Sequence, residues 1–430
     1  MAFLESCDVK VPNASRSKPQ ILFIAYGGGH IAMLLPVIEL TLKASFDVKV
    51  IAMTTARKVA ADAGLEPIGF ADLYEFAAPN AAEYGAQLCA GMIADGPVSL
   101  DESIAYHGIN FAELVEDFGQ AEASYLYKQH GRHAFLPKRF FTRVLAHLKP
   151  DVVVSTNSPR SERAAIEASR KLSIPALCAV DLFALQEVKW IGEKGYADKV
   201  CVLNESVRSM LISRGRKPEE VVVTGNPVFE KHVTRVARIG GASMKQERGW
   251  TGDKRTILWA SQEEPAIHPF NGATGDPRLP RLIEEQLRQF VEKHDGWRLV
   301  IRYHPSEKIS FVPSRNVDFS PRDEKLEYLL NAVDLVVVTA STVGLEAAIL
   351  GLPVISVDCS VWMPDTLFSK QGISTGVLAI KDLPAAIIQE GMKQERKIID
   401  VSNPLLRMPD KPAHAIFKQI VRLLGSADGP

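Results

Sequence analysis

The sequence predicts an α/β protein made of two doubly wound domains. The chain has 430 residues, which exceeds the roughly 250–300 residues that a single hydrophobic core usually supports. Short apolar runs of strand length alternate with helical patterns in two series, and this alternation is typical of parallel sheets covered by helices. The segment 230–253 between the two series is charged, contains glycine and is weakly patterned. We therefore expect a linker there, with the domain boundary between Pro227 and Arg255.

The first series follows residues 1–18, which we expect to be a frayed leader, and opens with an apolar strand at 20–25. The other elements expected in this half are strands at 48–53, 66–70, 151–155, 175–180, 199–203 and 221–224, and helices at 31–42, 57–65 and 160–171. Segment 78–147 predicts helices broken by glycines, among them Gly91, Gly108 and Gly131. Aromatic and basic residues gather near its end, from Tyr125 to Arg139. They form either a solvated helix face or an insertion that contacts an acceptor or a membrane.

A glycine loop follows the first strand. Gly28 and Gly29 lack a Cβ, so a ligand can approach their backbone closely. The pattern is not Gly-x-Gly-x-x-Gly, and no acidic residue ends the strand at 48–53, which disfavours a dinucleotide fold of oxidoreductase type. His30 stands at the start of the next helix, where a general base can reach a ligand. The alternative is a histidine that only caps this helix.

The second series contains the most informative stretch, from Asp334 to Asp358. Strands are expected at 256–260, 298–303, 335–338 and 354–357, and helices at 281–293, 325–332 and 383–394. Ser341 and Thr342 are good caps for a helix that follows the strand at 335–338, and a helix N-terminus there favours a phosphate group. Glu346 lies four residues after Thr342 on the same helix face, a spacing that suits a diphosphate at the hydroxyls and a ribose diol at the carboxylate. The alternative is a capped helix with a solvated glutamate.

Composition excludes several classes of protein. A net charge of -1 gives no support for nucleic-acid binding. The five cysteines are scattered without the paired spacing of a disulfide framework or a zinc site. No apolar run reaches the roughly 18 residues that suggest a membrane span. We therefore expect a cytoplasmic protein without metal or cofactor, and the sequence leaves open peripheral membrane contact and a homodimer.

These motifs resemble the GT-B superfamily, in which two Rossmann-like domains face a central cleft and the C-terminal half binds most of the nucleotide. The order of elements over residues 20 to 400 is similar to that of the peptidoglycan N-acetylglucosaminyltransferase and of the non-hydrolysing UDP-N-acetylglucosamine 2-epimerase. Gly28-Gly29-His30 and Ala260-Ser261-Gln262 resemble loops of the transferase. The segment 223–228, which contains Asn226, and the helix with Glu346 resemble segments found in both.

The chain also departs from these patterns. Glu263, Glu264 and Pro265 follow Ser261-Gln262 where the transferase has more glycine, and two carboxylates beside a diphosphate would repel it unless they point away. The epimerase has a His-Arg pair in this loop, which is absent here, so the resemblance favours the transferase. His304, in Arg302-Tyr303-His304-Pro305, is similar to a His-Pro of capsule and teichoic-acid transferases.

The resemblance implies an N-terminal acceptor-side domain at 1–229, a C-terminal nucleotide-sugar domain at 230–410 and a C-terminal helix at 411–430 that packs back on the first domain. It implies a metal-independent glycosyltransferase that uses a nucleotide-diphosphate sugar, with UDP as the expected nucleotide and a glycan, lipid-linked sugar or small molecule as acceptor. An epimerase and an inactive sugar-nucleotide-binding subunit are the alternatives. We expect His30 to be the base and to line the cleft. The expected nucleotide-sugar ligands are Gly28, Gly29, Asn226, Ser261, Gln262, Arg302, His304, Ser341, Thr342 and Glu346.

Overall fold

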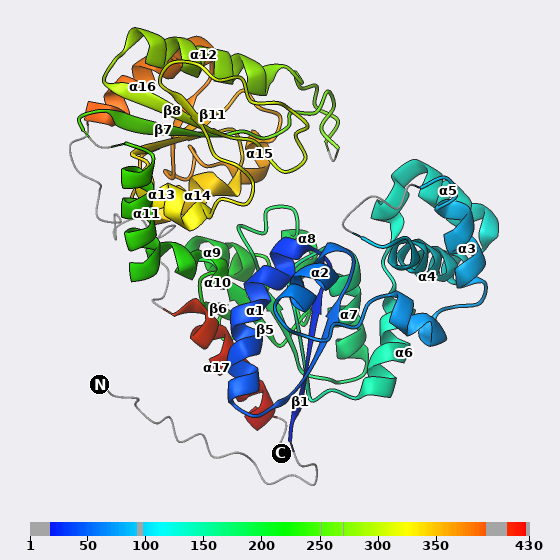
Figure 1. The fold of residues 1–430 in the computed structure, drawn as a ribbon. Helices are drawn as coiled ribbons and strands as arrows, with labels where there is room; N and C mark the ends of the chain where they lie inside the picture. The colour runs from blue at the N-terminus through cyan, green and yellow to red at the C-terminus, as the bar shows by residue number, and fades with distance from the viewer. Residues whose placement is uncertain (1–17, 93–97, 251, 270, 393–410, 427–430) are drawn as a thin grey trace. The chain divides into compact units, whose positions relative to one another are not determined.

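A computed structural model describes residues 18–92, 98–250, 252–269, 271–392 and 411–426. The expected leader therefore lies almost wholly outside the described residues. The described chain forms two compact units (Figure 1). Of the described residues, unit 1 comprises those up to Leu203, Val207–Pro227 and those from Lys411 onward, and unit 2 comprises Asn204–Ser206 and those from Val228 to Met392. Each unit has its own six-stranded parallel sheet, which confirms the predicted α/β class with two doubly wound domains.

The sheet of unit 1 has the strand order β2-β1-β3-β4-β5-β6. The strands are β1 (Gln20–Ala25), β2 (Asp47–Ala52), β3 (Val152–Ser155), β4 (Ala176–Ala179), β5 (Lys199–Val202) and β6 (Val221–Val223). The chain turns from β1 to β2 on one side and then crosses to β3 on the other side of β1. The loops that leave β1 and β3 therefore diverge at the carboxyl edge, and such a switch of direction is where open α/β sheets bind ligands.

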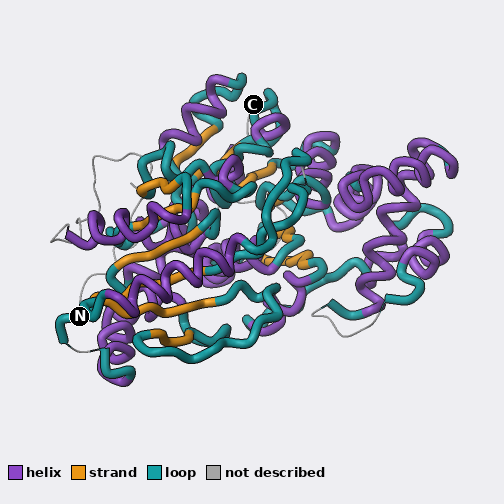
Figure 2. Tube along the Cα trace, turned by 90° about the horizontal axis from the view of Figure 1, so that it is seen from above, coloured by secondary structure: helices purple, strands orange, loops and turns teal. Residues whose placement is uncertain are grey.

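Helices connect the strands of this sheet, and Figure 2 draws helices in purple and strands in orange. The principal ones are α1 (Gly28–Lys43), α2 (Thr55–Asp62), α6 (Lys138–Leu148), α7 (Ser161–Lys171), α8 (Val188–Ile191) and α9 (Glu205–Ser213). The last helix, α17 (Pro412–Ser426), packs against α1, β3 and β4 of unit 1. The rings of Phe417 and Phe46 lie 6.2 Å apart between their centroids.

Between β2 and β3 the chain forms a helical group of α3 (Ala81–Leu88), α4 (Leu100–Phe118) and α5 (Gln120–His130), visible beside the sheet of unit 1 in Figure 1. The expectation that Gly108 breaks a helix is wrong, because this residue lies inside α4. A Cβ at Gly108 would lie 2.0 Å from the carbonyl oxygen of Ala81. The glycine instead allows α3 and α4 to pack closely.

The sheet of unit 2 has the order β12-β11-β10-β7-β8-β9, so its direction switches between β7 and β10. The strands are β7 (Arg255–Ala260), β8 (Trp297–Arg302), β9 (Val317–Phe319), β10 (Leu335–Val338), β11 (Val354–Val357) and β12 (Thr375–Val377). In Figure 1, α12 (Leu279–Lys293) and α16 (Leu383–Met392) cover one face, and α11 (Arg235–Glu247), α13 (Leu326–Ala332) and α14 (Thr342–Ile349) cover the other. The sequence did not predict β9 and β12, the two shortest strands of this sheet.

Two further expectations are corrected. Much of the expected linker is the helix α11, which Thr234 caps by accepting a hydrogen bond from the Ala237 N–H at 3.1 Å. The glycines that suggested a linker, Gly240 and Gly241, bring α11 close to α13. The expected strand at 66–70 is reduced to a single bridge between Ile51 and Ile68.

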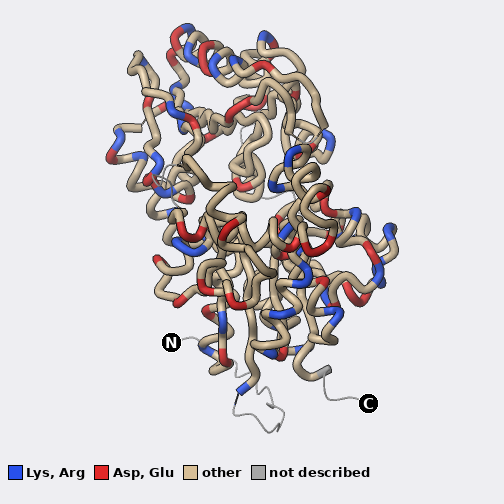
Figure 3. The backbone as a smooth tube through the Cα atoms, turned by 90° about the vertical axis from the view of Figure 1, so that its right-hand side faces the viewer, with Lys and Arg blue, Asp and Glu red and all other residues tan. Residues whose placement is uncertain are grey.

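Lys and Arg residues are interspersed with Asp and Glu residues along the tube in Figure 3, as expected for a chain with a net charge of -1. Within the described residues, no helix is both long and apolar enough to span a bilayer.

Candidate functional site

The carboxyl edge of unit 1 places His30 at the switch between β1 and β3. His30 lies in the first turn of α1, directly after β1, and its side chain remains about one quarter exposed. Thr156 and Glu162 come from the segment that follows β3, and both are fully buried. Because parallel strands end at the same edge of a sheet, the two segments meet there.

The hydrogen bonds of Thr156 fix the orientation of His30. The Thr156 hydroxyl donates to Glu162 Oε2 at 2.8 Å, so its oxygen is left to accept from His30 Nδ1, with which it pairs. Neutral His30 therefore carries its proton on Nδ1 and its lone pair on Nε2. A general base needs this arrangement, in which one nitrogen is anchored and the other can take a proton.

Glu162 also holds the surrounding backbone. Its Oε1 accepts from the Tyr26 N–H at 2.8 Å, and its Oε2 accepts from the Ser158 N–H at 2.7 Å. A buried carboxylate with this many donors stabilises both loops at the switch. Sequence analysis treated Glu162 only as part of a helix. The signal that could have identified Glu162 is an acidic residue in the first turn of a helix that follows a buried strand.

The charges around His30 are mostly acidic. Burial lowers the pKa of His30, but the negative charges of Glu162, Asp181 and Glu187 outweigh this effect and raise it above 6.5. The pKa of Glu187 is itself raised from 4.5, first by burial and then by the charge of Asp181. The edge of unit 1 therefore combines one histidine with several carboxylates, a set that can move protons.

The other predicted residues of unit 1 also lie at this edge, and two of them, Gly28 and Asn226, make hydrogen bonds within the protein. Gly28 is the first residue of α1, and its N–H donates to Thr55 Oγ1 at 3.0 Å. Gly29 is exposed, and a Cβ there would meet no atom within 4 Å. Asn226 is buried after β6 and donates to the Asp181 carbonyl at 2.8 Å.

In unit 2, the predicted helix start lies at the switch between β7 and β10. Ser341 caps α14, and its hydroxyl accepts from the Val343 N–H at 3.4 Å. Thr342 is the exposed first residue of this helix. Two buried oxygens flank the switch without a hydrogen-bond partner among the described residues: Oγ1 of Thr339 after β10 and Oε1 of Gln262 after β7. Unsatisfied buried polar atoms and a helix N-terminus at one edge favour a polar, anionic ligand.

Glu346 is 7% exposed and has a neighbour that sequence analysis missed. His232 Nε2 lies 2.6 Å from Glu346 Oε2, and the His232 side chain is fully buried. His232 comes from the segment that was expected to be a linker, where no pattern pointed to it. Neither of these two atoms has a hydrogen-bond partner among the described residues, so the Glu346 carboxylate is a buried acceptor whose hydrogen bonds the protein does not fill at Oε2.

Three predicted ligands instead belong to networks inside unit 2. Ser261 Oγ donates to Glu307 Oε1 at 2.9 Å and accepts from Arg281 at 2.7 Å. Arg302 donates to Ser320 Oγ and to the carbonyl of Pro321, at 2.8 and 3.1 Å, and burial lowers its pKa from 12.5. The His304 N–H donates to Glu307 Oε2 at 2.8 Å, and its exposed ring pairs with Ser306.

The two carboxylates that follow Gln262 do not both face a ligand. Glu264 is buried, and it accepts from the Ser360 hydroxyl and the Val361 N–H, each at 2.7 Å. Glu263 is exposed, and its carbonyl accepts from Trp362 Nε1 at 2.8 Å. Glu264 therefore joins the loops after β7 and β11, and its charge is held by donors of the protein.

Within the part of the chain that the structure describes, no group of three or more His, Cys, Asp or Glu residues is arranged to hold a metal ion. No protein-family model matches the chain, and no curated protein matches it by sequence.

Solved structures do match over nearly the whole chain. The UDP-N-acetylglucosamine 2-epimerase of Neisseria meningitidis bound to UDP-N-acetylglucosamine has a TM-score of 0.57 and 15% identity, covering 95% of this chain and 100% of that chain. The epimerase of Methanocaldococcus jannaschii, in complex with UDP-N-acetylglucosamine and UDP, has a TM-score of 0.54 and 16% identity, covering 95% and 99%. The glycosyltransferase of kitacinnamycin has a TM-score of 0.54 and 12% identity, covering 96% and 99%. At these identities the likeness shows the fold alone.

Proposed function

The chain has the GT-B fold. From this premise, we propose that it is an enzyme that transfers the sugar of a nucleoside-diphosphate sugar to an acceptor hydroxyl without using a metal ion. One observation carries the proposal: Thr156 and Glu162 orient His30 with its lone pair on Nε2. Glycosyl transfer requires a base for the acceptor hydroxyl, and an anchored imidazole of this kind supplies one.

Unit 2 is proposed to hold the donor. The N-terminus of α14, with Ser341 and Thr342, is suited to the diphosphate. The unpaired oxygens of Gln262 and Thr339 can meet further polar groups of the donor. Glu346, whose carboxylate lies beside the buried His232, is proposed to accept hydrogen bonds from the ribose hydroxyls. The N–H groups at the start of α14 and the hydroxyls of Ser341 and Thr342 are the donors proposed to stabilise the charge that grows on the departing diphosphate.

Epimerisation at C2 of the sugar is the second candidate. Several of the similar solved structures are UDP-N-acetylglucosamine 2-epimerases. The reaction breaks a C–H bond and re-forms it on the opposite face, so it needs groups that take and return a proton. Asp181 and Glu187, whose charges raise the pKa of His30, are suitable carboxylates.

Proton NMR of UDP-N-acetylglucosamine in D2O tests the two reactions. An epimerase exchanges the C2 proton for deuterium and produces the manno epimer without an acceptor. A transferase leaves that proton in place and releases UDP when an acceptor is added. Sugar-nucleotide binding without either reaction, across UDP-, GDP-, CDP- and dTDP-sugars and a panel of acceptors, would contradict the proposal of an enzyme and leave a binding subunit.

A further inference from the structure

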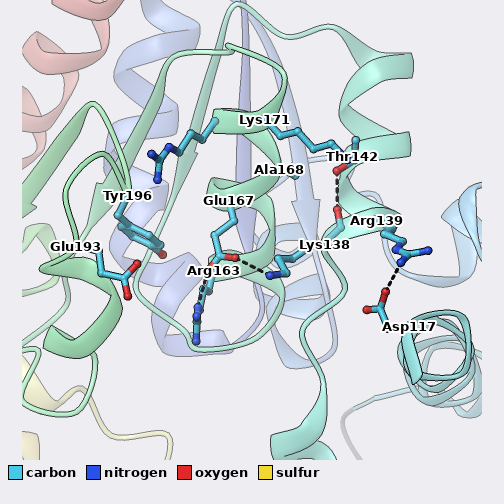
Figure 4. A pocket seen from close by; sticks show the side chains of 11 residues that line it. Asp117, Lys138, Arg139, Thr142, Arg163, Glu167, Ala168, Lys171, Glu193 and Tyr196 are labelled. Atoms are coloured by element: carbon cyan, nitrogen blue, oxygen red, sulfur yellow. Dashed lines mark hydrogen bonds and ion pairs between the residues drawn. The ribbon is translucent and has the colours of Figure 1, made fainter. Parts of the chain in front are cut away.

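A pocket lies in unit 1 beside α7. Its volume is about 560 Å³, within the usual range for small-molecule sites. It is lined by residues of α6, of α7 and of the segment after α8, together with Asp117 at the end of α4. Figure 4 shows Tyr196 and Glu193 on one side of the pocket and Lys138 and Thr142 on the other, with α7 side chains between them. None of the residues assigned to the proposed reaction lines it.

Positive charge dominates the lining of this pocket. Five basic and three acidic residues contribute, a surplus of two positive charges. Glu167 neutralises part of this charge, since it pairs with Arg163 at 2.7 Å and with Lys138 at 3.3 Å. Arg139 pairs with Asp117 at 2.8 Å. Arg170 and Lys171, at the end of α7, are exposed and form no ion pair with any described residue. Arg170 and Lys171 are therefore the two cations of the lining that have no ion-pair partner among the described residues.

A buried hydroxyl provides an independent sign of a ligand. Tyr196 is only 4% exposed, yet its hydroxyl has no hydrogen-bond partner among the described residues. Burial, followed by nearby charges that include Glu167, raises the pKa of Tyr196 well above 10, so the hydroxyl remains a donor. An unsatisfied buried hydroxyl is costly unless a ligand or water accepts its hydrogen bond.

Glu193, which lies on the same side of the pocket as Tyr196 (Figure 4), indicates what else the ligand carries. The exposed carboxylate of Glu193 lines the same pocket. A carboxylate repels a bare anion but accepts hydrogen bonds from hydroxyl groups. A molecule that carries both an anionic group and hydroxyl groups matches the cations, the Tyr196 hydroxyl and the Glu193 carboxylate that line the pocket. The surplus of two positive charges matches a phosphate monoester, which carries about −1.5 to −2 at neutral pH.

We propose that this pocket binds a phosphorylated sugar. Its phosphate contacts Arg170 and Lys171 and accepts a hydrogen bond from Tyr196, and its hydroxyls donate to Glu193. Arginine and lysine both suit phosphate, because their donors are charged.

Calorimetric titration of glucose 6-phosphate into the full chain tests this proposal, with glucose and inorganic phosphate as matched probes. We expect glucose 6-phosphate to bind more tightly than phosphate, and glucose to give no detectable binding. The double variant Arg170→Gln/Lys171→Gln should raise its dissociation constant about tenfold or more. Tyr196→Phe, which removes only the hydroxyl, should raise it about three- to tenfold. Glu193→Gln should weaken the binding of glucose 6-phosphate without weakening the binding of inorganic phosphate.

The control is Lys43→Gln/Lys58→Gln, which removes two positive charges from exposed positions on α1 and α2 and should leave binding within about twofold. Melting temperatures verify that each variant is folded. Absence of binding to the wild type would mean that water alone fills the pocket, and this would overturn the proposal. Loss of binding in Ser341→Ala, with no loss in the α7 variants, would also overturn it, because the phosphate would then bind at α14.

Discussion

His30 Nδ1 lies 3.5 Å from Glu162 Oε2, and the Thr156 hydroxyl bridges the two groups. The histidine follows β1 and the carboxylate follows β3, so 132 positions of sequence separate them. The bridge leaves Nε2 of His30 as the nitrogen that can accept a proton. The first two predictions depend on this relationship.

His30→Ala is expected to lower kcat by about 10²- to 10⁴-fold, the usual contribution of a general base. The dissociation constant of the donor should stay within about twofold, because a base acts in the transition state. Steady-state kinetics together with calorimetry of the donor separate the two quantities. His414→Ala, at an exposed position of α17, is the control. Equal losses in kcat and in donor affinity would mark His30 as a structural cap.

The pH dependence of kcat/KM should change when a charge beside His30 is removed. A general base must be unprotonated, so activity rises with pH through the pKa of His30, which the surrounding carboxylates raise above 6.5. Glu162→Gln removes the first of these charges, so the acid limb should move to lower pH. Glu39→Gln, at an exposed position of α1, should leave the limb in place. A limb that moves to higher pH in Glu162→Gln, or not at all, would contradict the role of Glu162.

Glu113 is expected to make unit 1 less stable as pH rises. This carboxyl is buried, and burial raises its pKa from 4.5 to about 7 although the N–H groups of Arg139 and Phe140 donate to it. A raised carboxyl pKa means that the folded state holds its proton longer, so stability falls between pH 4.5 and 7, by roughly 3 kcal/mol. Burial lowers the pKa of His107 to about 4, which opposes this trend.

Comparison with Glu113→Gln isolates the contribution of Glu113, since His107 is the same in both proteins. The difference in unfolding free energy between pH 5 and pH 8 should shrink in this variant. Glu122→Gln, at an exposed position of α5, should behave like the wild type. An unchanged pH dependence in Glu113→Gln would show that this carboxyl is ionised in the folded protein.

Gly240→Ala should destabilise unit 2. A Cβ at this position would lie 2.5 Å from the ring of Tyr328 on α13, and overpacking of this kind costs about 1–3 kcal/mol. Denaturant titration followed by tryptophan fluorescence suits the measurement, because Trp250, Trp259, Trp297 and Trp362 lie in unit 2. Gly296→Ala is the control, since a Cβ there meets no atom within 4 Å. Equal stability of the two variants would show that α11 and α13 have room to separate.

The sequence predicted the elements whose signal is local. The apolar run at Leu335–Val338 and the cap at Ser341 were recognised because strand burial and helix capping depend on neighbouring residues. Gly240 was misread as a linker residue because its role depends on Tyr328, which is distant in sequence.

The candidate sites show the same difference between local signals, which the sequence contains, and contacts between distant residues, which it does not reveal. His30 and Glu346 lie next to recognisable strand and helix boundaries, so sequence analysis selected them. Their neighbours Glu162 and His232 come from distant segments, and only the folded arrangement reveals the contacts. Ser261 and Arg302 resembled ligands by motif, but their side chains contact other residues of unit 2.

Calorimetric titration of UDP into the wild type and into Glu346→Ala tests the proposed sugar-nucleotide enzyme most directly. Loss of a hydrogen bond to a charged group costs about 1.5–3 kcal/mol, so we expect UDP to bind the variant roughly ten- to a hundred-fold more weakly. Glu346→Gln should lose less, because its amide oxygen still accepts a hydrogen bond, and 2′,3′-dideoxy-UDP should bind wild type and Glu346→Ala almost equally. Unchanged affinity for UDP in a folded Glu346→Ala variant would contradict the assignment of this site to a nucleotide.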